Sequence, residues 1–530
     1  MSTVSATGCD QPQAIADLLR SSCARFPDQP AIVGDGRSVT YAELGARSAA
    51  LARGLVDLGL AVGDRVAYLG RNATEYWELF FAAGKAGLVI VPLNFRLSGA
   101  EVEWALQDCR PGLVLVEQQL RDLVPDAYPG TVLVFDQGGN DVSAHSPGVD
   151  SYEKWLADQP AADPQRDQTG DAVFSIMYSS GTTGRPKGVI TTVRGLLWAV
   201  QAFSAQFDVS SSSASLVPTP YYHIAAGGWA LIAFAAGGRI IQFTEVTAER
   251  LLGHIVGHHA THVIMVPTVI AAFIADPIAS GADYSSVEHL VYGGSPISET
   301  VMIGAQEVFG AKLSQSYGLT ETIGVTTLLA PADHVVGEGD RLRSAGRAVP
   351  GVQLRVVDPV TGTEVPSGTD GEVQTRGPGV TPGYWGRPDA TADATRPGGW
   401  LRTGDIGHLD DDGYLYLRDR LKDMIVSGGE NVYPAEVENV IAAHRAVLDV
   451  AVIGIPSDTW GETPLAVVVA RDGADLDPED LIAFTRERLA HYKCPTAVEI
   501  VSALPRNPSG KVLKRQLREE YPAMTGARSR

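Results

Sequence analysis

Short apolar, β-branched runs alternate with longer helical patterns between residues 60 and 320, and this rhythm constrains the fold more than any other feature. The runs are RVAYL, LVIVPL, VFSIMY, RIIQF, HVIMVP and HLVYGG, and an amphipathic or alanine-rich stretch follows each of them. Strands that alternate with helices in this way form stacked βα units with largely parallel sheets. The sequence therefore predicts an α/β fold.

The character of the chain changes twice after this region. From about residue 337, Gly, Pro and Asp become frequent and the apolar runs are brief, as in LRVVD, GEVQTR and YLYLRD. Near Lys422 a third region begins, with helices expected over Pro434–His444 and Pro478–Leu489 and strands DVAVIGI and LAVVVA. A chain of 530 residues exceeds what one core usually supports. We expect a large N-terminal domain over 1–421, with a β-rich subdomain over about 337–421, and a small α/β domain over 422–530.

Charge and composition narrow the range of partners. The formal net charge is −20, which repels nucleic acid and anionic lipid, so cations that hold an anionic ligand should be few and local. The most apolar window, 227–243, is interrupted by glycines and Arg239, so we expect no integral membrane segment. The four cysteines have no metal-site spacing and the first 20 residues have no signal pattern. These features predict a cytoplasmic protein.

The segment SSGTTGRPKG, residues 179–188, directly follows the run VFSIMY and predicts a phosphate-binding loop. Glycines and small hydroxyl residues let backbone N–H groups approach phosphate oxygens, and Arg185 and Lys187 add positive charge. The glycine spacing of a Walker A loop is absent before Lys187, which disfavours an ordinary P-loop kinase or GTPase. Taken alone, the segment also fits a Gly/Ser surface loop. The residues expected to bind ATP here are Ser179, Ser180, Gly181, Thr182, Thr183, Gly184 and Lys187.

Residues 178–188 resemble the phosphate-loop signature of the acyl-adenylate-forming superfamily, of the acyl-CoA synthetase (fatty-acid or aryl acid–CoA ligase) type. Four further segments resemble signatures of that superfamily in the same order: YGLTET, WLRTGD, RDRLKDMIVSGGEN and PRNPSGK. The resemblance spans residues 20 to 515. It implies that an acid and ATP give acyl-AMP and pyrophosphate, and that coenzyme A then takes the acyl group and releases AMP. It also implies Mg²⁺, a mobile small domain with the active site at the domain interface, and is compatible with a homodimer.

The YGLTET segment predicts contacts to ATP and its metal. The ring of Tyr317 can cover adenine, the Thr320 hydroxyl can reach a phosphate, and Glu321 offers the hard oxygen that Mg²⁺ prefers. The resemblance agrees with these roles and places catalysis at Thr320 and Glu321. Without that context, Thr-Glu after a glycine would be a helix start.

Further nucleotide contacts are expected at two places. Asp405 is a carboxylate suited to ribose hydroxyls, with an Asx turn as the alternative, and Arg420 resembles the second ribose contact of the superfamily. The resemblance places adenine and part of the acyl pocket against the strand end at Gly293, Gly294 and Ser295, together with Tyr317 and Gly318. A generic turn is the alternative there.

Lys511 is the residue expected to catalyse adenylation. Its ammonium, in a Pro/Gly-framed loop, can neutralise charge as the carboxylate approaches the α-phosphate, although a solvated basic face is the alternative. Because Lys511 and pyrophosphate must leave before a thiol arrives, we expect the small domain to swing. The resemblance places the hinge at Lys422 and the coenzyme A channel at Gly428 and Gly429.

The acyl group is expected beside His223, which matches the superfamily position that borders the carboxylate and the thiol path. Residues 224–229 follow it without a charge, so we predict an uncharged tail, aromatic or medium-chain. The pocket residues predicted are His223, Ala225, Gly228, Trp229, Gly294, Gly318, Gly324 and Val325.

Two alternative functions stay open. A stand-alone adenylation enzyme could load a carrier protein, but Ile224 stands where peptide-synthetase domains usually hold an amino group with Asp. Little chain follows Lys511, which disfavours a fused carrier domain. A non-catalytic nucleotide-binding relative is disfavoured because Lys511, Glu321 and Asp405 are all present.

Overall fold

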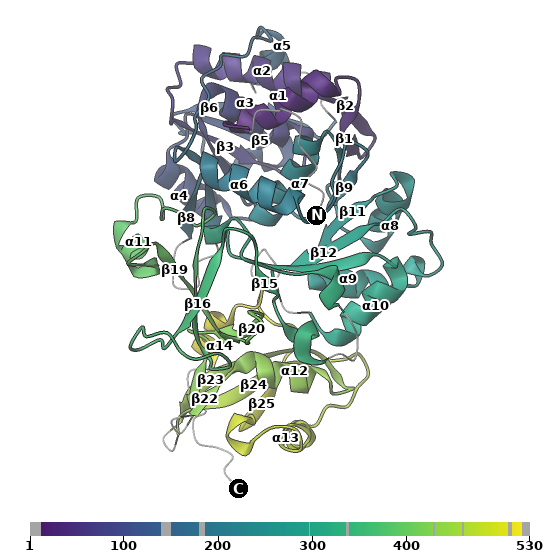
Figure 1. The fold of residues 1–530 in the computed structure, drawn as a ribbon, viewed down its shortest axis with the longest axis vertical. Coiled ribbons are helices and arrows are strands. Elements are labelled where there is room, and N and C mark those ends of the chain that lie inside the picture. Colours follow the sequence, from purple (N-terminus) through teal and green to yellow (C-terminus); the bar gives the residue numbers. More distant parts are fainter. Residues whose placement is uncertain are drawn as a thin grey trace, which may run out of the picture. The chain divides into compact units, whose positions relative to one another are not determined.

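The computed structural model describes residues 12–138, 150–179, 186–295, 297–334, 339–427, 430–457, 460–506 and 511–521 (Figure 1). These residues form two compact units. The first unit contains the described residues up to Gln353 together with Arg376–Leu401. The second contains Leu354–Thr375 and the described residues from Arg402 onward.

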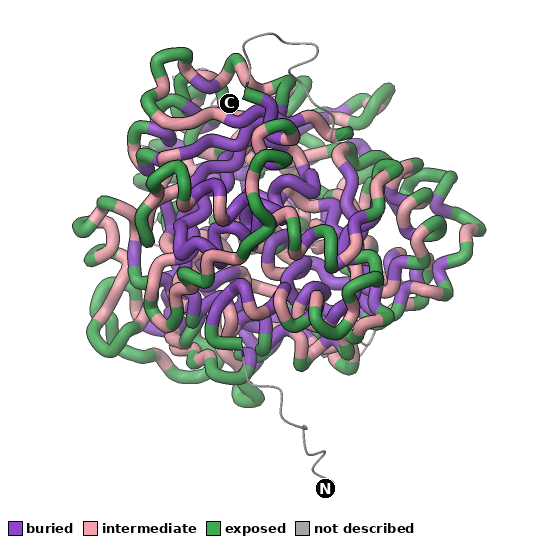
Figure 2. The backbone as a smooth tube through the Cα atoms, turned by 90° about the horizontal axis from the view of Figure 1, so that it is seen from above, coloured by how far each residue is buried: buried purple, intermediate pink, exposed green. Residues whose placement is uncertain are grey.

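A six-stranded sheet lies in the first unit, in the order β6-β5-β3-β4-β7-β8. Neighbouring strands are parallel except for β7 and β8, which form an antiparallel pair. Strands β4 and β5 are buried at every residue, which explains their continuous apolar sequence. Figure 2 colours the backbone by burial, with the buried segments in purple. The strands are β3 (Arg65–Leu69), β4 (Val89–Leu93), β5 (Leu113–Glu117), β6 (Thr131–Phe135), β7 (Val173–Ser179) and β8 (Lys187–Thr192).

The other sheet of the first unit has nine strands in the order β15-β14-β13-β12-β11-β9-β10-β1-β2. Pairing from β13 across to β1 is parallel, and both edges carry antiparallel strands. The strands are β1 (Pro30–Gly34), β2 (Arg37–Thr40), β9 (Ala214–Val217), β10 (Arg239–Gln242), β11 (His262–Met265), β12 (His289–Gly293), β13 (Lys312–Tyr317), β14 (Thr327–Leu329) and β15 (Arg347–Ala348).

The helices of the first unit mostly connect these parallel strands, as βα units require. They are α1 (Ile15–Arg25), α2 (Tyr41–Asp57), α3 (Thr74–Ala86), α4 (Gly99–Cys109), α5 (Tyr152–Ala157), α6 (Val193–Ser204), α7 (Ile224–Ala236), α8 (Ala248–Gly257), α9 (Pro267–Ala275), α10 (Glu299–Phe309) and α11 (Pro388–Ala394).

The remaining strands form two five-stranded sheets. One has the order β16-β17-β19-β18 with β20 paired to β19, and the other has the order β22-β21-β24-β23 with β25 paired to β24. Their bounds are β16 (Gln353–Val357), β17 (Gly371–Arg376), β18 (Thr395–Arg396), β19 (Trp400–Leu409), β20 (Leu415–Arg420), β21 (Ile425–Ser427), β22 (Glu430–Val432), β23 (Val447–Ser457), β24 (Gly461–Ala470) and β25 (Ala497–Ile500). Helices α12 (Pro434–Ala442), α13 (Pro478–Arg486) and α14 (Lys514–Glu520) accompany them.

The predicted α/β fold and the strands read from the apolar runs are confirmed. Helix α13 ends earlier than predicted, at Arg486 rather than Leu489, because the Thr485 carbonyl accepts from the backbone N–H groups of both Arg488 and Leu489. This doubly used acceptor closes the last turn. The predicted domains, 1–421 and a small mobile domain over 422–530, stay a prediction.

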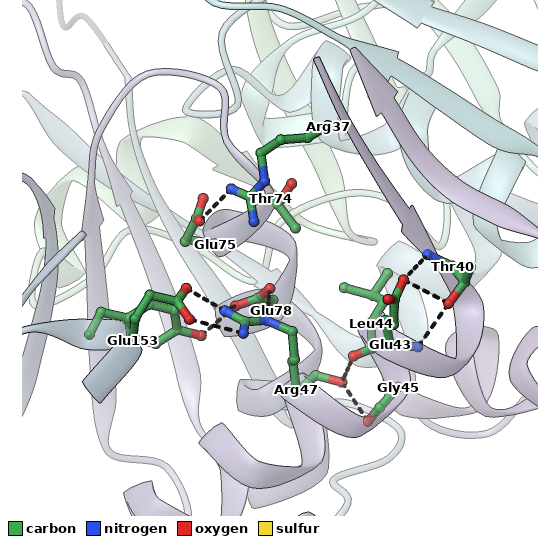
Figure 3. Close-up of polar contacts among 12 residues, drawn as sticks. Arg37, Thr40, Glu43, Leu44, Gly45, Arg47, Thr74, Glu75, Glu78 and Glu153 are labelled. Atoms are coloured by element: carbon green, nitrogen blue, oxygen red, sulfur yellow. Dashed lines mark hydrogen bonds and ion pairs between the residues drawn. The ribbon is translucent and has the colours of Figure 1, made fainter. Parts of the chain in front are cut away.

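Helix α3 is buried along its whole length, including Glu78. A buried carboxylate is costly unless charges and hydrogen bonds compensate it. Arg47 of α2 donates to both oxygens of Glu78, at 2.6 and 3.1 Å, and also donates to Glu153 (Figure 3). The Tyr152 hydroxyl donates a further short hydrogen bond to Glu78. This set of contacts ties α2 and α5 to the central helix.

The buried cation of the same helix is compensated by neutral acceptors. The Lys85 ammonium donates to the Gly45 carbonyl at 2.9 Å and to the Ser48 hydroxyl at 2.8 Å, both on α2. Burial lowers the pKa of Lys85 to about 8 because desolvation disfavours the charged form. Helix α2 therefore supplies partners to Glu78, in the first half of α3, and to Lys85, near the end of α3.

Glu75, in the first turn of α3, is less well compensated than Glu78. Its Oε1 accepts from Arg37 at 2.7 Å, whereas Oε2 is buried with no hydrogen-bond partner among the described residues (Figure 3). Burial, followed by the nearby carboxylate of Glu78, raises the pKa of Glu75 to about 7. The native state therefore holds a proton here that an unfolded chain releases near pH 4.5.

Glu75→Gln should become more stable relative to the unaltered protein as the pH rises from about 5 to about 7. The folded pKa lies above the unfolded value, so ionisation costs native stability across this window, by up to about 3 kcal/mol, and no further above it. Melting temperatures of both proteins across this range measure the effect. Glu43→Gln is the matched control, because helix-capping hydrogen bonds from Thr40 lower the pKa of Glu43. The prediction is contradicted if the difference in melting temperature between the unaltered protein and Glu75→Gln stays constant across this pH range.

Candidate active site

The carboxyl ends of β12 and β13 bring two predicted nucleotide-binding segments together. The strands are parallel neighbours with Gly293 opposite Ser316, so residues 293–295 and 317–318 leave the sheet at the same edge. A Cβ atom at Gly293 would lie only 2.2 Å from the Ser316 carbonyl oxygen, so only glycine fits there. Ligands of open α/β sheets bind outside this edge.

The turn after β13 holds Thr320 and Glu321 in a fixed shape. Thr320–Thr322 forms a short 3₁₀ turn, in which the Thr322 hydroxyl accepts from the Leu319 N–H at 2.9 Å. The Gly324 N–H donates to the Leu319 carbonyl at 2.8 Å, and a Cβ atom at Gly318 would overlap the Gly324 backbone. Side-chain and backbone bonds therefore close this loop without help from a ligand.

Glu321 is held by contacts from a distant part of the same unit. Its Oε1 accepts from the Tyr384 hydroxyl at 2.9 Å, and its backbone carbonyl accepts from the Thr381 N–H at 2.7 Å. The Lys187 ammonium lies 4.9 Å from the centre of the Tyr384 ring, within cation–π range. Burial, and then the Glu321 charge, raise the pKa of Tyr384, so its hydroxyl stays a donor at neutral pH. One tyrosine thus bridges the predicted metal ligand and the phosphate-loop lysine.

The predicted phosphate loop begins and ends at paired residues of the β7–β8 hairpin. Ser179 is opposite Lys187, and its hydroxyl donates to the Lys187 carbonyl at 3.3 Å. The pairing anchors Lys187 at the start of β8. The other residues predicted to bind phosphate in this loop, Ser180, Gly181, Thr182, Thr183 and Gly184, lie outside the described residues.

Tyr384 was not singled out from the sequence. It belongs to the segment PGYWG, and an aromatic pair between glycines is a weak signal for a ligand contact. Its bond to Glu321 joins residues 63 positions apart, so local pattern could not reveal it.

His223 stands directly before α7, where a neighbouring loop is tightly held. The His223 N–H donates to the Pro220 carbonyl at 3.0 Å, and the ring centre of Tyr222 lies 4.4 Å from that of His223. Asn72 pins the same loop, because its Oδ1 accepts from the Tyr221 N–H at 2.9 Å and its Nδ2 donates to the Thr219 carbonyl at 3.0 Å. Asn72 is a positioning residue that no sequence pattern singles out.

The residues predicted for the acyl pocket have different environments. Ala225 is exposed, Gly228 and Gly324 are half-buried, and Val325 is buried. A methyl group of Ile224 packs over Gly324, since a Cβ atom there would lie 3.5 Å from Ile224 Cγ2. This contact places the start of α7 beside the loop that follows Glu321.

Trp229, predicted to line the acyl pocket, is buried among other side chains. It is only 1% exposed, and its ring packs against Phe207 and His262, with ring centres 5.2 and 6.3 Å away. The structure shows Trp229 as a core residue. Its contact with an acyl group stays a prediction.

In the second unit, the two predicted ribose ligands form an ion pair. Asp405 of β19 is opposite Arg420 of β20, and the Arg420 Nε lies 2.8 Å from Asp405 Oδ1. The Asp405 side chain is 7% exposed and that of Arg420 is 41% exposed. The pairing orients a carboxylate and a guanidinium at one point of the sheet.

The predicted hinge is a turn between β20 and β21 that is anchored on both sides. Asp419 Oδ2 accepts from the Ala435 N–H at 2.7 Å, and Arg518 of α14 donates to Asp423 at 2.8 Å. Lys422 lies between these two anchors. Both anchors join the turn to helices of the second unit.

Cations gather around Lys422. Burial chiefly, and then the positive charges of Arg420, Arg518 and Lys511, lower the pKa of the Lys422 ammonium, against the effect of Asp423. Lys511 is exposed and shares this surface. Two of these cations are paired with carboxylates, Arg420 with Asp405 and Arg518 with Asp423. The predicted channel glycines Gly428 and Gly429 lie outside the described residues.

Family models match most of the chain. Residues 19–385 match the AMP-binding enzyme model, and residues 436–511 match the AMP-binding enzyme C-terminal domain. The chain belongs to the AMP-binding enzyme family. Within it, the chain is an acyl-CoA synthetase, an AMP-forming acid–CoA ligase that uses ATP in two steps. The family and reaction class predicted from the motifs are confirmed.

Several relatives resemble this AMP-binding enzyme over nearly its whole length. Fatty acid–[acyl-carrier-protein] ligase ScoC of Streptomyces coeruleorubidus is 38% identical over 96% of this chain and 97% of its own. Feruloyl-CoA synthase of an Amycolatopsis species is 38% identical over 93% and 96%. The solved structure of ATP-bound MatB from Rhodopseudomonas palustris has a TM-score of 0.87 and 31% identity, covering 96% of this chain and 100% of that one.

Tyr384→Phe should slow formation of the acyl-adenylate by roughly tenfold. It removes the hydrogen bond to Glu321, and bonds to charged groups typically contribute about 1.5–3 kcal/mol, while a ring remains beside Lys187. Pyrophosphate release at several Mg²⁺ concentrations measures the change. Tyr128→Phe, which removes a tyrosine hydrogen bond to the Pro111 carbonyl, is the control and should keep its rate. An unchanged rate in Tyr384→Phe would show that the bridge has no catalytic role.

Proposed function

We propose that this acyl-CoA synthetase activates an uncharged carboxylic acid with an aromatic or medium-chain tail. The observation that carries the proposal is the start of α7, where residues 224–229 bring no charge beside His223 and the loop after Glu321. An acid with a second carboxylate would need a cation at this position, because an unpaired buried charge is strongly disfavoured.

In the first step, an oxygen of the substrate carboxylate attacks the α-phosphorus of ATP, and the bond to pyrophosphate breaks. Both reactants are anions, so positive charge is required where they meet. We assign Lys187 to the phosphates, Asp405 and Arg420 to the ribose, and Lys511 to the meeting point of carboxylate and α-phosphate. Tyr317 and residues 293–295 are assigned to adenine.

Mg²⁺ fits the residues present. It prefers octahedral oxygen coordination and is usually held by one or two carboxylates together with substrate phosphates. Among the described residues there is no group of three or more metal-ligating side chains, which agrees with a site completed by the nucleotide. Glu321 would hold the ion, since its carboxylate is fixed by Tyr384, and Thr320 would contact a phosphate. The ion would neutralise charge on the phosphates.

In the second step, the sulfur of coenzyme A attacks the carbonyl carbon of the acyl-adenylate, and AMP leaves. We propose that the turn at Lys422 is the hinge that removes Lys511 before this attack, with Gly428 and Gly429 in the thiol channel and His223 at its border. A small domain that swings between the two steps would serve both with one set of residues.

An acyl-carrier protein is the alternative to coenzyme A as the thiol acceptor. ScoC is named for an acyl-carrier protein, whereas the feruloyl enzyme is named for coenzyme A, and both are 38% identical to this chain. Loading of a separate carrier protein is therefore the second candidate function. Among the described residues, no helix is long and apolar enough to span a bilayer. A cytoplasmic location and a homodimer stay predictions.

Pyrophosphate release should be fastest with benzoate, cinnamate or octanoate in a panel that also contains palmitate and malonate. Each acid is tested under three conditions: without a thiol acceptor, with coenzyme A, and with a phosphopantetheinylated carrier protein. Acyl-CoA is the expected product. A preference for malonate would overturn the proposed tail, and thioester formation on the carrier alone would overturn the proposed acceptor.

Lys511→Ala should reduce adenylate formation by roughly a hundredfold and leave the conversion of supplied acyl-AMP to acyl-CoA largely intact. A preorganised cation that stabilises transition-state charge typically contributes this much, and here it would act in the first step only. Arg515→Ala is the matched control, because Arg515 is an exposed cation nearby on α14. Equal losses in both half-reactions would refute the assignment.

A further inference from the structure

A small, partly enclosed cavity lies behind Ile224 in the first unit. Strands β4, β7 and β8 and helices α3, α6 and α7 line it, mostly with apolar side chains. Its free space is close to that of a single water molecule. The residues around it are Tyr76, Phe80, Ile90, Pro92, Ser175, Met177, Thr191, Leu196, Ile224, Gly227, Gly228 and Leu231.

One polar group in this lining is unsatisfied. Thr191 is 2% exposed, and its hydroxyl has no hydrogen-bond partner among the described residues. Ser175 is the cross-strand neighbour of Thr191 in the β7–β8 pair, so both side chains lie on the same face of the sheet and both line the cavity. A buried hydroxyl without a partner costs about 1–3 kcal/mol, which a polar ligand group could recover.

The cavity is next to the proposed acyl site. Ile224 lines the cavity and also packs over Gly324, in the loop that follows Glu321. Gly227 and Gly228 line the cavity from α7, and a Cβ atom at either position would meet no other atom within 4 Å. Ile224 therefore stands between the cavity and the proposed acyl site.

We propose that Thr191 is a specificity-determining residue for acids whose tail ends in a hydroxyl group. The tail would pass Ile224 and Gly228, and its terminal hydroxyl would occupy the water-sized space and bond to Thr191. The apolar lining suits the carbon chain, and the Thr191 hydroxyl favours one small polar group at its end. This inference rests on the proposed function, because it names the substrate class of the same site.

The experiment compares acids that differ by one terminal hydroxyl: octanoate with 8-hydroxyoctanoate, and cinnamate with 4-hydroxycinnamate. We measure kcat/KM for pyrophosphate release and take the ratio of the hydroxylated to the plain acid. The unaltered enzyme should favour the hydroxylated member of at least one pair by roughly tenfold, and Thr191→Val should lower that ratio to about one, because valine keeps the shape and removes the hydroxyl.

Thr192→Val is the matched control, one residue along the same strand. The Thr192 hydroxyl accepts from the Gly195 N–H at 3.1 Å and caps α6, so its loss should lower the melting temperature and leave the ratio unchanged. Thr191→Val should melt at the same or a higher temperature, since an unpaired buried hydroxyl is removed.

Two results would overturn the inference. One is an unaltered enzyme without preference in either pair, and the other is a preference that survives Thr191→Val. In both, Thr191 would be a core residue whose hydroxyl binds trapped water. Failure to release pyrophosphate with any acid would instead overturn the proposed function, so the two failures are distinguishable.

Discussion

Compensation of the charges on α3 is the interaction on which the first unit depends. Glu78 and Lys85 are buried on a helix with no exposed residue, and α2 supplies partners to both. The same helix begins beside Asn72, which holds the loop before His223, and its Tyr76 lines the cavity behind Ile224. An error in pairing these charges would therefore displace the acyl site as well as the core.

The protein is strongly acidic and yet must bind anionic substrates. It has no need of a broad basic surface, because individual cations are held in position by neighbouring side chains. The Lys187 ammonium lies on the Tyr384 ring, and Arg420 is paired with Asp405, so each cation is oriented before an anion arrives. Orientation in advance reduces the reorganisation that charge development would otherwise require. Lys511 lies near Lys422 and is exposed.

The strands and the ordered motifs could be predicted from the sequence, because apolar runs and glycine-rich loops are recognisable within a few consecutive residues. The sequence also singled out Thr320 and Glu321, which share one turn, and Asp405 and Arg420, which form an ion pair; their roles stay predictions. Tyr384, Asn72 and Thr191 escaped notice because each acts through a contact that only the tertiary structure creates. Trp229 packs in the core against Phe207, and its predicted contact with an acyl group stays a prediction.

The buried helix also has a consequence for the order in which the chain is made. Glu78 depends on Tyr152, which lies 74 residues later in the sequence. At translation rates of 5–20 residues per second, this partner emerges roughly 4 to 15 seconds after the carboxylate it must satisfy. Until then Glu78 has its ion pair with Arg47 but lacks its contacts from α5, so closure of the sheet over α3 is less favourable. In nascent chains of this enzyme α3 should therefore stay exposed at the ribosome. Its apolar residues, together with the charges of Glu78 and Lys85, would then be accessible to chaperones.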